Sequence, residues 1–157
     1  MNRFFAVTLG FFVFLFSSCV NMKYCNFVEI DAPVEKVFAI LESYESYPSF
    51  IPEFHKSVQI ISEEKRGKGV VFQNLSTWNN YKMKSKYEIT EYEENAFIKM
   101  KNLTQYGFTE IRVEKISEGK TKYTLSNELS IPKIMREKLF SSFDKELVLV
   151  KEYCEKK

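Results

Sequence analysis

The chain has 157 residues, of which 45% are hydrophobic and 16% aromatic, and its 23 basic and 21 acidic residues leave a formal charge of +2. This composition excludes a disordered chain, and the small net charge gives no reason to expect a nucleic-acid partner. A single domain of this size buries enough surface to fold without a metal ion or a disulfide.

Residues 1–18 have the pattern of a signal peptide of the bacterial lipoprotein type. Arg3 precedes an apolar run from Phe4 to Phe16, which is shorter than the roughly 20 residues that a membrane-spanning helix needs. Two serines precede Cys19, and the large apolar Phe16 occupies the −3 position, as in signals whose cysteine receives the lipid. We therefore expect lipidation at Cys19, a tether over residues 19–23, and a lipid-anchored location in the bacterial cell envelope, on its periplasmic or surface face. An uncleaved anchor and ordinary secretion are the alternatives.

The predicted elements that follow form one domain over residues 24–157. Residues 25–30 are predicted to be a short strand and residues 31–43 a helix, with Pro33 in its first turn. Val34, Val37, Phe38 and Leu41 give this helix one apolar face. Residues 46–54 are predicted to form a second, very short helix that stops at Pro52.

From Lys56 to Ile131 the hydrophobic pattern alternates with a period of two, which predicts six short strands. The clearest run is residues 81–90, in which Tyr81, Met83, Ser85 and Tyr87 alternate with lysines and acidic or hydroxyl side chains. Turn-like segments separate the runs, so we expect an antiparallel meander with one buried face and one solvated face.

Residues 132–154 return to a helical period and predict one long helix that begins at Pro132. It is amphipathic, so we expect it to cover the sheet and not to span a membrane. Its apolar stripe consists of Met135, Leu139, Phe143, Leu147, Val150 and Cys154.

The segment "IDAPVEKVFAILESYESYPSFIPEF", residues 30–54, resembles the opening of the START-like polyketide cyclase/dehydrase superfamily. Within it, "YPSFIP" is similar to a Tyr-Pro-x-Phe-aliphatic-Pro signature of the ubiquinone-binding and aromatase/cyclase-like branches. The resemblance implies an α+β helix-grip fold, in which a curved antiparallel sheet of about seven strands wraps around a long C-terminal helix. It also implies two short helices after the first strand and an apolar cavity for lipids, quinones or polyketides, with catalysis in a minority of members.

In that fold, Phe50 and Phe54 would close one end of the cavity; the alternative is that they are ordinary core residues. Ser85, Thr109 and Asn127 interrupt the inward apolar faces. They indicate either a cavity that holds water or a ligand's polar end, or partners within the sheet. The candidate ligand-binding residues are Phe50, Phe54, Phe72, Trp78, Tyr81, Met83, Ser85, Tyr87, Met100, Thr109, Ile111, Tyr123, Leu125, Asn127, Leu139 and Phe143.

Two further cysteines leave an open question. In an oxidising compartment Cys25 and Cys154 can form a disulfide that links the first strand to the last helix. The alternative is two buried thiols that act as small hydrophobic side chains. The sequence does not give the distance between them, so both remain open.

The sequence contains little that indicates catalysis. The single histidine, His55, has no nucleophile nearby, so we interpret it as a satisfied or exposed residue at the start of a strand. Paired metal-ligand spacings and glycine-rich phosphate loops are missing from the sequence, so we expect no metal and no cofactor.

Three hypotheses follow. The first, which we favour, is an envelope-tethered protein that binds or carries a small apolar ligand. The second is an enzyme of the cyclase, dehydratase or hydrolase type, with an inward tyrosine or His55 as its acid or base. The third is an interaction module with a filled core.

Overall fold

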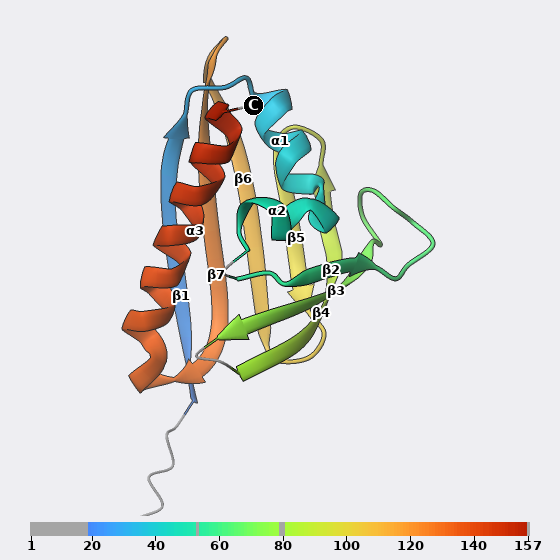
Figure 1. Ribbon diagram of the computed structural model, residues 1–157, viewed down its shortest axis with the longest axis vertical. Coiled ribbons are helices and arrows are strands. Elements are labelled where there is room, and N and C mark those ends of the chain that lie inside the picture. The colour runs from blue at the N-terminus through green and yellow to red at the C-terminus, as the bar shows by residue number, and fades with distance from the viewer. Residues whose placement is uncertain (1–18, 53, 79–80, 157) are drawn as a thin grey trace, which may run out of the picture.

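The computed structural model describes residues 19–156 except 53, 79 and 80, and it leaves the side chains of Trp78 and Tyr81 undescribed. In Figure 1 the long C-terminal helix and the shorter helices lie on the same face of the sheet. In chain order the elements are β1 (Cys19–Ile30), α1 (Val34–Glu42), the 3-10 turn η1 (Tyr44–Ser46), α2 (Tyr47–Phe50), β2 (Ser57–Ile60), β3 (Val71–Trp78), β4 (Tyr81–Glu93), β5 (Phe97–Asn102), β6 (Gly107–Ser117), β7 (Lys120–Pro132), the 3-10 turn η2 (Lys133–Met135) and α3 (Arg136–Lys156).

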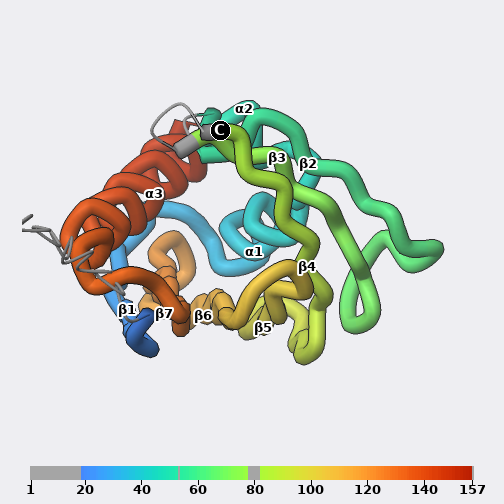
Figure 2. Tube along the Cα trace, turned by 90° about the horizontal axis from the view of Figure 1, so that it is seen from below, coloured from blue at the N-terminus to red at the C-terminus, as the bar shows by residue number. Residues whose placement is uncertain are grey.

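The seven strands form one sheet in the order β1-β7-β6-β5-β4-β3-β2, and every neighbouring pair is antiparallel. Figure 2 shows the sheet curving from β1 round to β2, with α1 inside the curve and α3 across its open side. The predicted helix-grip fold is therefore confirmed, including the meander, the short helices after the first strand and the long terminal helix.

The first strand is longer than the sequence predicts. Residues 19–23, which we expected as a tether, pair with residues 128–132 of β7. The reason is that the alternation extends further back than residue 25, since Met22 and Tyr24 are buried while Lys23 and Cys25 are exposed. Cys19 is thus the first residue of the described sheet, and residues 1–18, the predicted signal peptide, lie outside the described residues.

The predicted inward faces form the core. Along β5, β6 and β7 most inward residues are buried, with Thr109 and Leu129 partly exposed, and the apolar positions of α1 are buried as well. Phe50 of α2 stacks on Tyr153 of α3, with ring centroids 4.7 Å apart, which joins the short helix to the long one. None of the helices in the described ranges is long and apolar enough to cross a membrane.

The two cysteines named above have different surroundings, and neither is in a disulfide. Cys25 points away from α3, on the outer face of β1, where the hydroxyl of Ser126 lies 3.2 Å from its sulfur. Cys154 is buried on the α3 side of the sheet, and burial raises the pKa of its thiol to about 11. The structure thus does not form the disulfide, because successive side chains of a strand point to opposite faces. The buried-thiol alternative describes Cys154 only.

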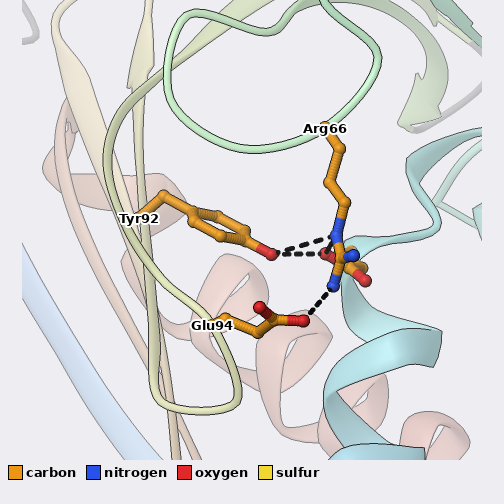
Figure 3. Close-up of polar contacts among 4 residues, drawn as sticks. Arg66, Tyr92 and Glu94 are labelled. Carbon is orange, nitrogen blue, oxygen red and sulfur yellow. Dashed lines mark hydrogen bonds and ion pairs between the residues drawn. The ribbon is translucent and has the colours of Figure 1, made fainter.

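A polar cluster connects the loop between β2 and β3 to the rest of the fold (Figure 3). Arg66 of this loop donates to Glu42 at the end of α1 through Nε at 2.9 Å, and to Glu94 at 2.7 Å. The hydroxyl of Tyr92 on β4 donates to the same Glu42 oxygen at 2.8 Å. Every one of these four side chains therefore has a polar partner.

Candidate functional site

A cavity of about 450 Å³ lies between the concave face of the sheet and α3. This volume falls within the roughly 300–1,000 Å³ that ligand pockets occupy. Its walls come from the start of β1, from α2 and the segment that follows it, from β3 to β7, from η2 and from the first half of α3. Most of the larger side chains on these walls are apolar, among them Phe54, Phe72, Met83, Met100, Phe108, Ile111, Leu125, Leu129, Leu139 and Phe143.

Most of the candidate ligand-binding residues lie on this wall: Phe54, Phe72, Met83, Ser85, Tyr87, Met100, Thr109, Ile111, Leu125, Asn127, Leu139 and Phe143. Two other candidates do not line the cavity. Phe50 is buried against Tyr153, which agrees with the core-packing alternative, and Tyr123 is almost completely buried near the start of β7. The side chains of Trp78 and Tyr81 lie outside the described part of the chain.

The cavity has two ends. Its mouth, defined here by Cys19, Gln105, Pro132 and Met135, lies where β1 begins and β7 ends, and the residues Cys19 and Gln105 are exposed. Glu146 is the last residue of α3 on the wall and lies about 16 Å along the helix from Met135, at a rise of about 1.5 Å per residue. The next buried positions of the helix, Leu147 and Val150, belong to the core. The apolar stripe of α3 is therefore divided between the cavity and the core.

The three polar residues on the inward faces all line the cavity, and two of them also bond to each other. The hydroxyl of Thr109 donates to Oδ1 of Asn127 at 2.7 Å, across β6 and β7. Ser85 lies opposite Asn74 in the pairing of β3 with β4. We had expected these polar residues either to face a cavity or to have partners within the sheet. They face the cavity, and Thr109 and Asn127 are in addition partners of each other.

Glu146 is the most unusual group on the wall. Its side chain is partly buried, and within the described residues no group donates a hydrogen bond to its carboxyl or pairs with its charge. Burial raises the pKa of this carboxyl to about 7, because the apolar surroundings disfavour the charged form. At neutral pH the carboxyl therefore exchanges readily between its protonated and ionised forms.

His55 and Asn74 add two more polar atoms without partners. Nδ1 of His55 and Oδ1 of Asn74 are buried and have no hydrogen-bond partner among the described residues. Burial lowers the pKa of His55, and the nearby Asn74 side chain opposes this shift more weakly. The imidazole also packs on Tyr47, with ring centroids 5.2 Å apart. His55 is thus a partly buried side chain on the cavity wall, and our interpretation of it as a satisfied or exposed residue holds only in part, because the Asn74 side chain interacts with its ring while Nδ1 has no partner.

Sequence reasoning missed Glu146, although a signal for it existed. Glu146 follows Phe143 by three residues and Leu139 by seven, so it lies on the same helical face as the apolar stripe. The sequence pattern indicated a cavity position less clearly for His55 and Asn74, since His55 follows Pro52 outside any regular element.

Across residues 19–156, apart from those left undescribed, no group of three or more His, Cys, Asp or Glu side chains could hold a metal ion.

Comparison with known proteins identifies the family. The model of the family described as polyketide cyclase / dehydrase and lipid transport matches residues 23–155. The chain therefore belongs to this family, and the predicted START-like superfamily membership is confirmed. This family has a fold that binds hydrophobic ligands in a cavity between sheet and helix, which matches the cavity described above. No curated protein matches the chain.

Several solved structures share the fold. A START superfamily protein from Mycobacterium smegmatis has a TM-score of 0.71 at 16% identity, covering 85% of this chain and 97% of its own. The Zhui aromatase/cyclase from Streptomyces sp. R1128 has a TM-score of 0.70 at 16% identity, covering 87% and 94%. Ara h 8.0201 has a TM-score of 0.68 at 14% identity, covering 88% and 100%. Identities this low establish a common fold and no common activity.

Proposed function

We propose that this protein is a membrane-tethered lipoprotein of the bacterial cell envelope, on its periplasmic or surface face, that binds or carries a small apolar ligand in the cavity. The ligand class is a lipid, a quinone or a polyketide-like molecule. The observation that carries the proposal is the cavity itself, whose walls are mainly apolar and whose volume fits such a molecule. A filled core would have favoured the interaction module, so the cavity counts against that hypothesis.

The position of Cys19 supports the tether. Cys19 is exposed, begins β1 and lies at the cavity mouth. A lipid attached to this residue would hold the mouth close to the membrane surface, so an apolar ligand could pass between the bilayer and the cavity with little exposure to water. The signal peptide over residues 1–18 remains part of the proposal.

Exposed apolar side chains gather at the same end of the molecule. Ile134 of η2 is 88% exposed, although a large aliphatic side chain is normally buried. Further exposed apolar residues near the mouth come from β1, β4 and the loop between β5 and β6: Val20, Met83, Leu103 and Tyr106. Such a group of apolar side chains would be suited to contact with a membrane surface.

A second candidate function is an enzyme of the cyclase or dehydratase type that uses the same cavity. The observation in its favour is Glu146, because a carboxyl with a pKa of about 7 can give and take protons at neutral pH. His55, neutral and on the same wall, could act as a second proton carrier. Family membership is compatible with both candidates.

One preparation tests both parts of the proposal. The full chain is expressed in a bacterium, and its membrane fraction is examined by intact mass spectrometry and by organic extraction of the bound material. We expect a chain that begins at a lipid-modified Cys19 and a stoichiometric apolar compound in the extract. Cys19→Ala should abolish the modification, whereas Cys25→Ala should leave it intact.

The outcomes separate the hypotheses. An unmodified chain in the soluble fraction would contradict the tether. An extract without any apolar compound, together with no binding of added lipids and quinones, would contradict the carrier. If an added ligand is converted to a product, and Glu146→Gln stops the conversion, the enzyme replaces the carrier as the better description.

A further inference from the structure

The charge of the cavity wall is restricted to one residue. The chain has 23 basic and 21 acidic residues, but Glu146 is the only Asp, Glu, Lys or Arg among the described residues that line the cavity. An anionic ligand head inside the cavity would have no lysine or arginine to pair with, and it would lie in the same low-dielectric space as the carboxyl. The electrostatics of the wall therefore favour a ligand head that is cationic.

The hydrogen-bonding capacity of the wall points in the same direction. Oδ1 of Asn74 accepts hydrogen bonds only and lies on a residue that is just 4% exposed; it makes no well-formed hydrogen bond, although the His55 side chain is close enough to interact with the Asn74 amide. The carboxylate form of Glu146 is also an acceptor, and Nδ1 of a neutral histidine can be one. Buried polar atoms in folded proteins are nearly always paired, so unpaired acceptors on a cavity wall indicate a ligand that donates.

The arrangement of the wall residues indicates which part of the ligand is apolar and which part is charged. Between the mouth and Glu146 the helix presents Leu139 and Phe143, and the facing strands present Ile111, Leu125 and Leu129. A ligand that reaches Glu146 from the mouth thus passes mainly apolar side chains, interrupted by Thr109 and Asn127, whose side chains bond to each other. We therefore expect its body to be mainly apolar and its charged group to be the innermost one.

We propose that the ligand is an amphiphilic amine, with an apolar body and a protonated amine head that pairs with the Glu146 carboxylate at the inner end of the cavity. This inference rests on the proposed carrier function and narrows its ligand class. When Glu146 is protonated before binding, its proton passes to solvent as the ammonium group takes its place. Binding of the amine should therefore strengthen as pH rises through the range in which the carboxyl ionises.

Other titratable groups face Glu146, and they remain neutral over that range. The charge of Glu146 raises the pKa values of four tyrosines, from β1, α2, β4 and β7, in addition to the larger effect of their own burial: Tyr24, Tyr47, Tyr87 and Tyr123. These hydroxyls stay protonated below pH 9. His55, whose pKa is lowered by burial, is neutral above its ordinary titration range, so a pH effect near neutrality is assigned to Glu146.

Calorimetric titration of the full chain in lipid nanodiscs tests the proposal, with empty nanodiscs as the blank. The probes are decylamine, decanol and decanoate, which share the same chain and differ in the head group. At pH 8 we expect decylamine to bind about tenfold more tightly than decanol, and decanoate to bind most weakly. Near pH 5 the preference for the amine should largely disappear, because the carboxyl is then protonated.

Two variants complete the test. Glu146→Gln should remove the preference for decylamine over decanol at pH 8. Glu137→Gln, at an exposed position of the same helix, should leave both this preference and decanol binding unchanged. The pH dependence of the unmodified chain needs no substitution, so it stands even if a variant folds poorly.

The failures are distinguishable. If decanol and decylamine bind equally at both pH values, and Glu146→Gln has no effect, the amine head is excluded while the apolar carrier stands. If none of the three probes binds, the carrier itself is contradicted. Stronger binding of decanoate than of decylamine would also overturn the inference, since it would place a cationic group in the cavity.

Discussion

Glu42 and Glu146 carry the same side chain on two helices of one domain, in opposite surroundings. Glu42 accepts hydrogen bonds from Arg66 and Tyr92 at the molecular surface, and Arg66 also pairs with Glu94. Glu146 faces a cavity and has no partner among the described residues. The Glu42 carboxylate thus has its hydrogen-bond partners within the fold, whereas the Glu146 carboxyl remains free to bind water or a ligand.

The difference shows how polar groups can be sorted into structural and functional ones. A folded chain pairs its buried polar atoms because leaving one unpaired costs about 1–3 kcal/mol. The cluster around Arg66 follows this rule and connects three elements. Glu146, His55 and Asn74 depart from it on the wall of one cavity, so their cost must be offset by water or by a ligand.

The largest expected effect is a gain in stability at alkaline pH when Glu146 is replaced by Gln. The folded state raises the pKa of Glu146 from 4.5 to about 7, so it binds the proton more tightly than the unfolded chain. Stability from this group is complete below about pH 4.5 and is lost as pH rises through 7. Urea unfolding should show the variant more stable by up to about 3 kcal/mol at pH 8 and equal near pH 4.

His55 has the opposite pH dependence, but it is present in both chains and cancels in this comparison. Its lowered pKa reduces stability only as pH falls through the ordinary histidine range. A difference between the Glu146→Gln and parent chains that does not change with pH would mean that Glu146 is not buried as the structure shows.

The same substitution at Glu42 should have the opposite sign. Glu42→Gln replaces charge-assisted hydrogen bonds from Arg66 and Tyr92 by neutral ones, on a side chain that is only 14% exposed. We expect a loss of about 1 kcal/mol in urea unfolding at pH 7. Glu94→Gln is the matched control, because its side chain is 60% exposed and its pair should contribute less than about 0.5 kcal/mol. If Glu42→Gln instead stabilised the protein, the opposite signs predicted for the Glu42 and Glu146 variants would be contradicted.

A smaller loss is expected at the Thr109–Asn127 bond, which lies on the cavity wall. Thr109→Val removes the donor and leaves Oδ1 of Asn127 facing the cavity. Water in the cavity can replace the lost hydrogen bond, so the change should be about 0.5 kcal/mol, below the cost of an unpaired atom in a dry core. Thermal unfolding measures it. A loss above about 2 kcal/mol would indicate that the cavity excludes water at this point.

The smallest effect on ligand binding is expected at Tyr44, whose hydroxyl lacks a partner but which does not line the cavity. Its hydroxyl is buried without a partner, but the ring stacks on Phe72 in the packed core, with centroids 4.7 Å apart. Tyr44→Phe removes an unpaired buried polar atom and should raise stability by about 1 kcal/mol in urea unfolding. Ligand binding should be unchanged. Loss of binding in this variant would show that the cavity extends to Tyr44.

The fold was largely predictable from local patterns, because each strand alternates and the last helix has a clear apolar stripe. Those patterns placed Ile111, Leu125 and Leu139 on the inner surface. They did not distinguish the cavity from the core, since Phe54 and Phe50 have the same chemistry and only the tertiary packing separates them. Glu146 was missed because a charged residue on an amphipathic helix is normally solvated.

The most direct measurement is calorimetric titration of decanol into the full chain in nanodiscs, compared between the parent chain and Leu139→Trp. Leu139 lies on the cavity wall between the mouth and Glu146, so a larger ring there should fill the path of the ligand. Val148→Trp, at an exposed position of the same helix, is the matched control. We predict that the parent and the control bind decanol and that Leu139→Trp binds at least about tenfold more weakly while remaining folded. Equal binding by all three chains, or binding by none, would contradict the cavity as the ligand site.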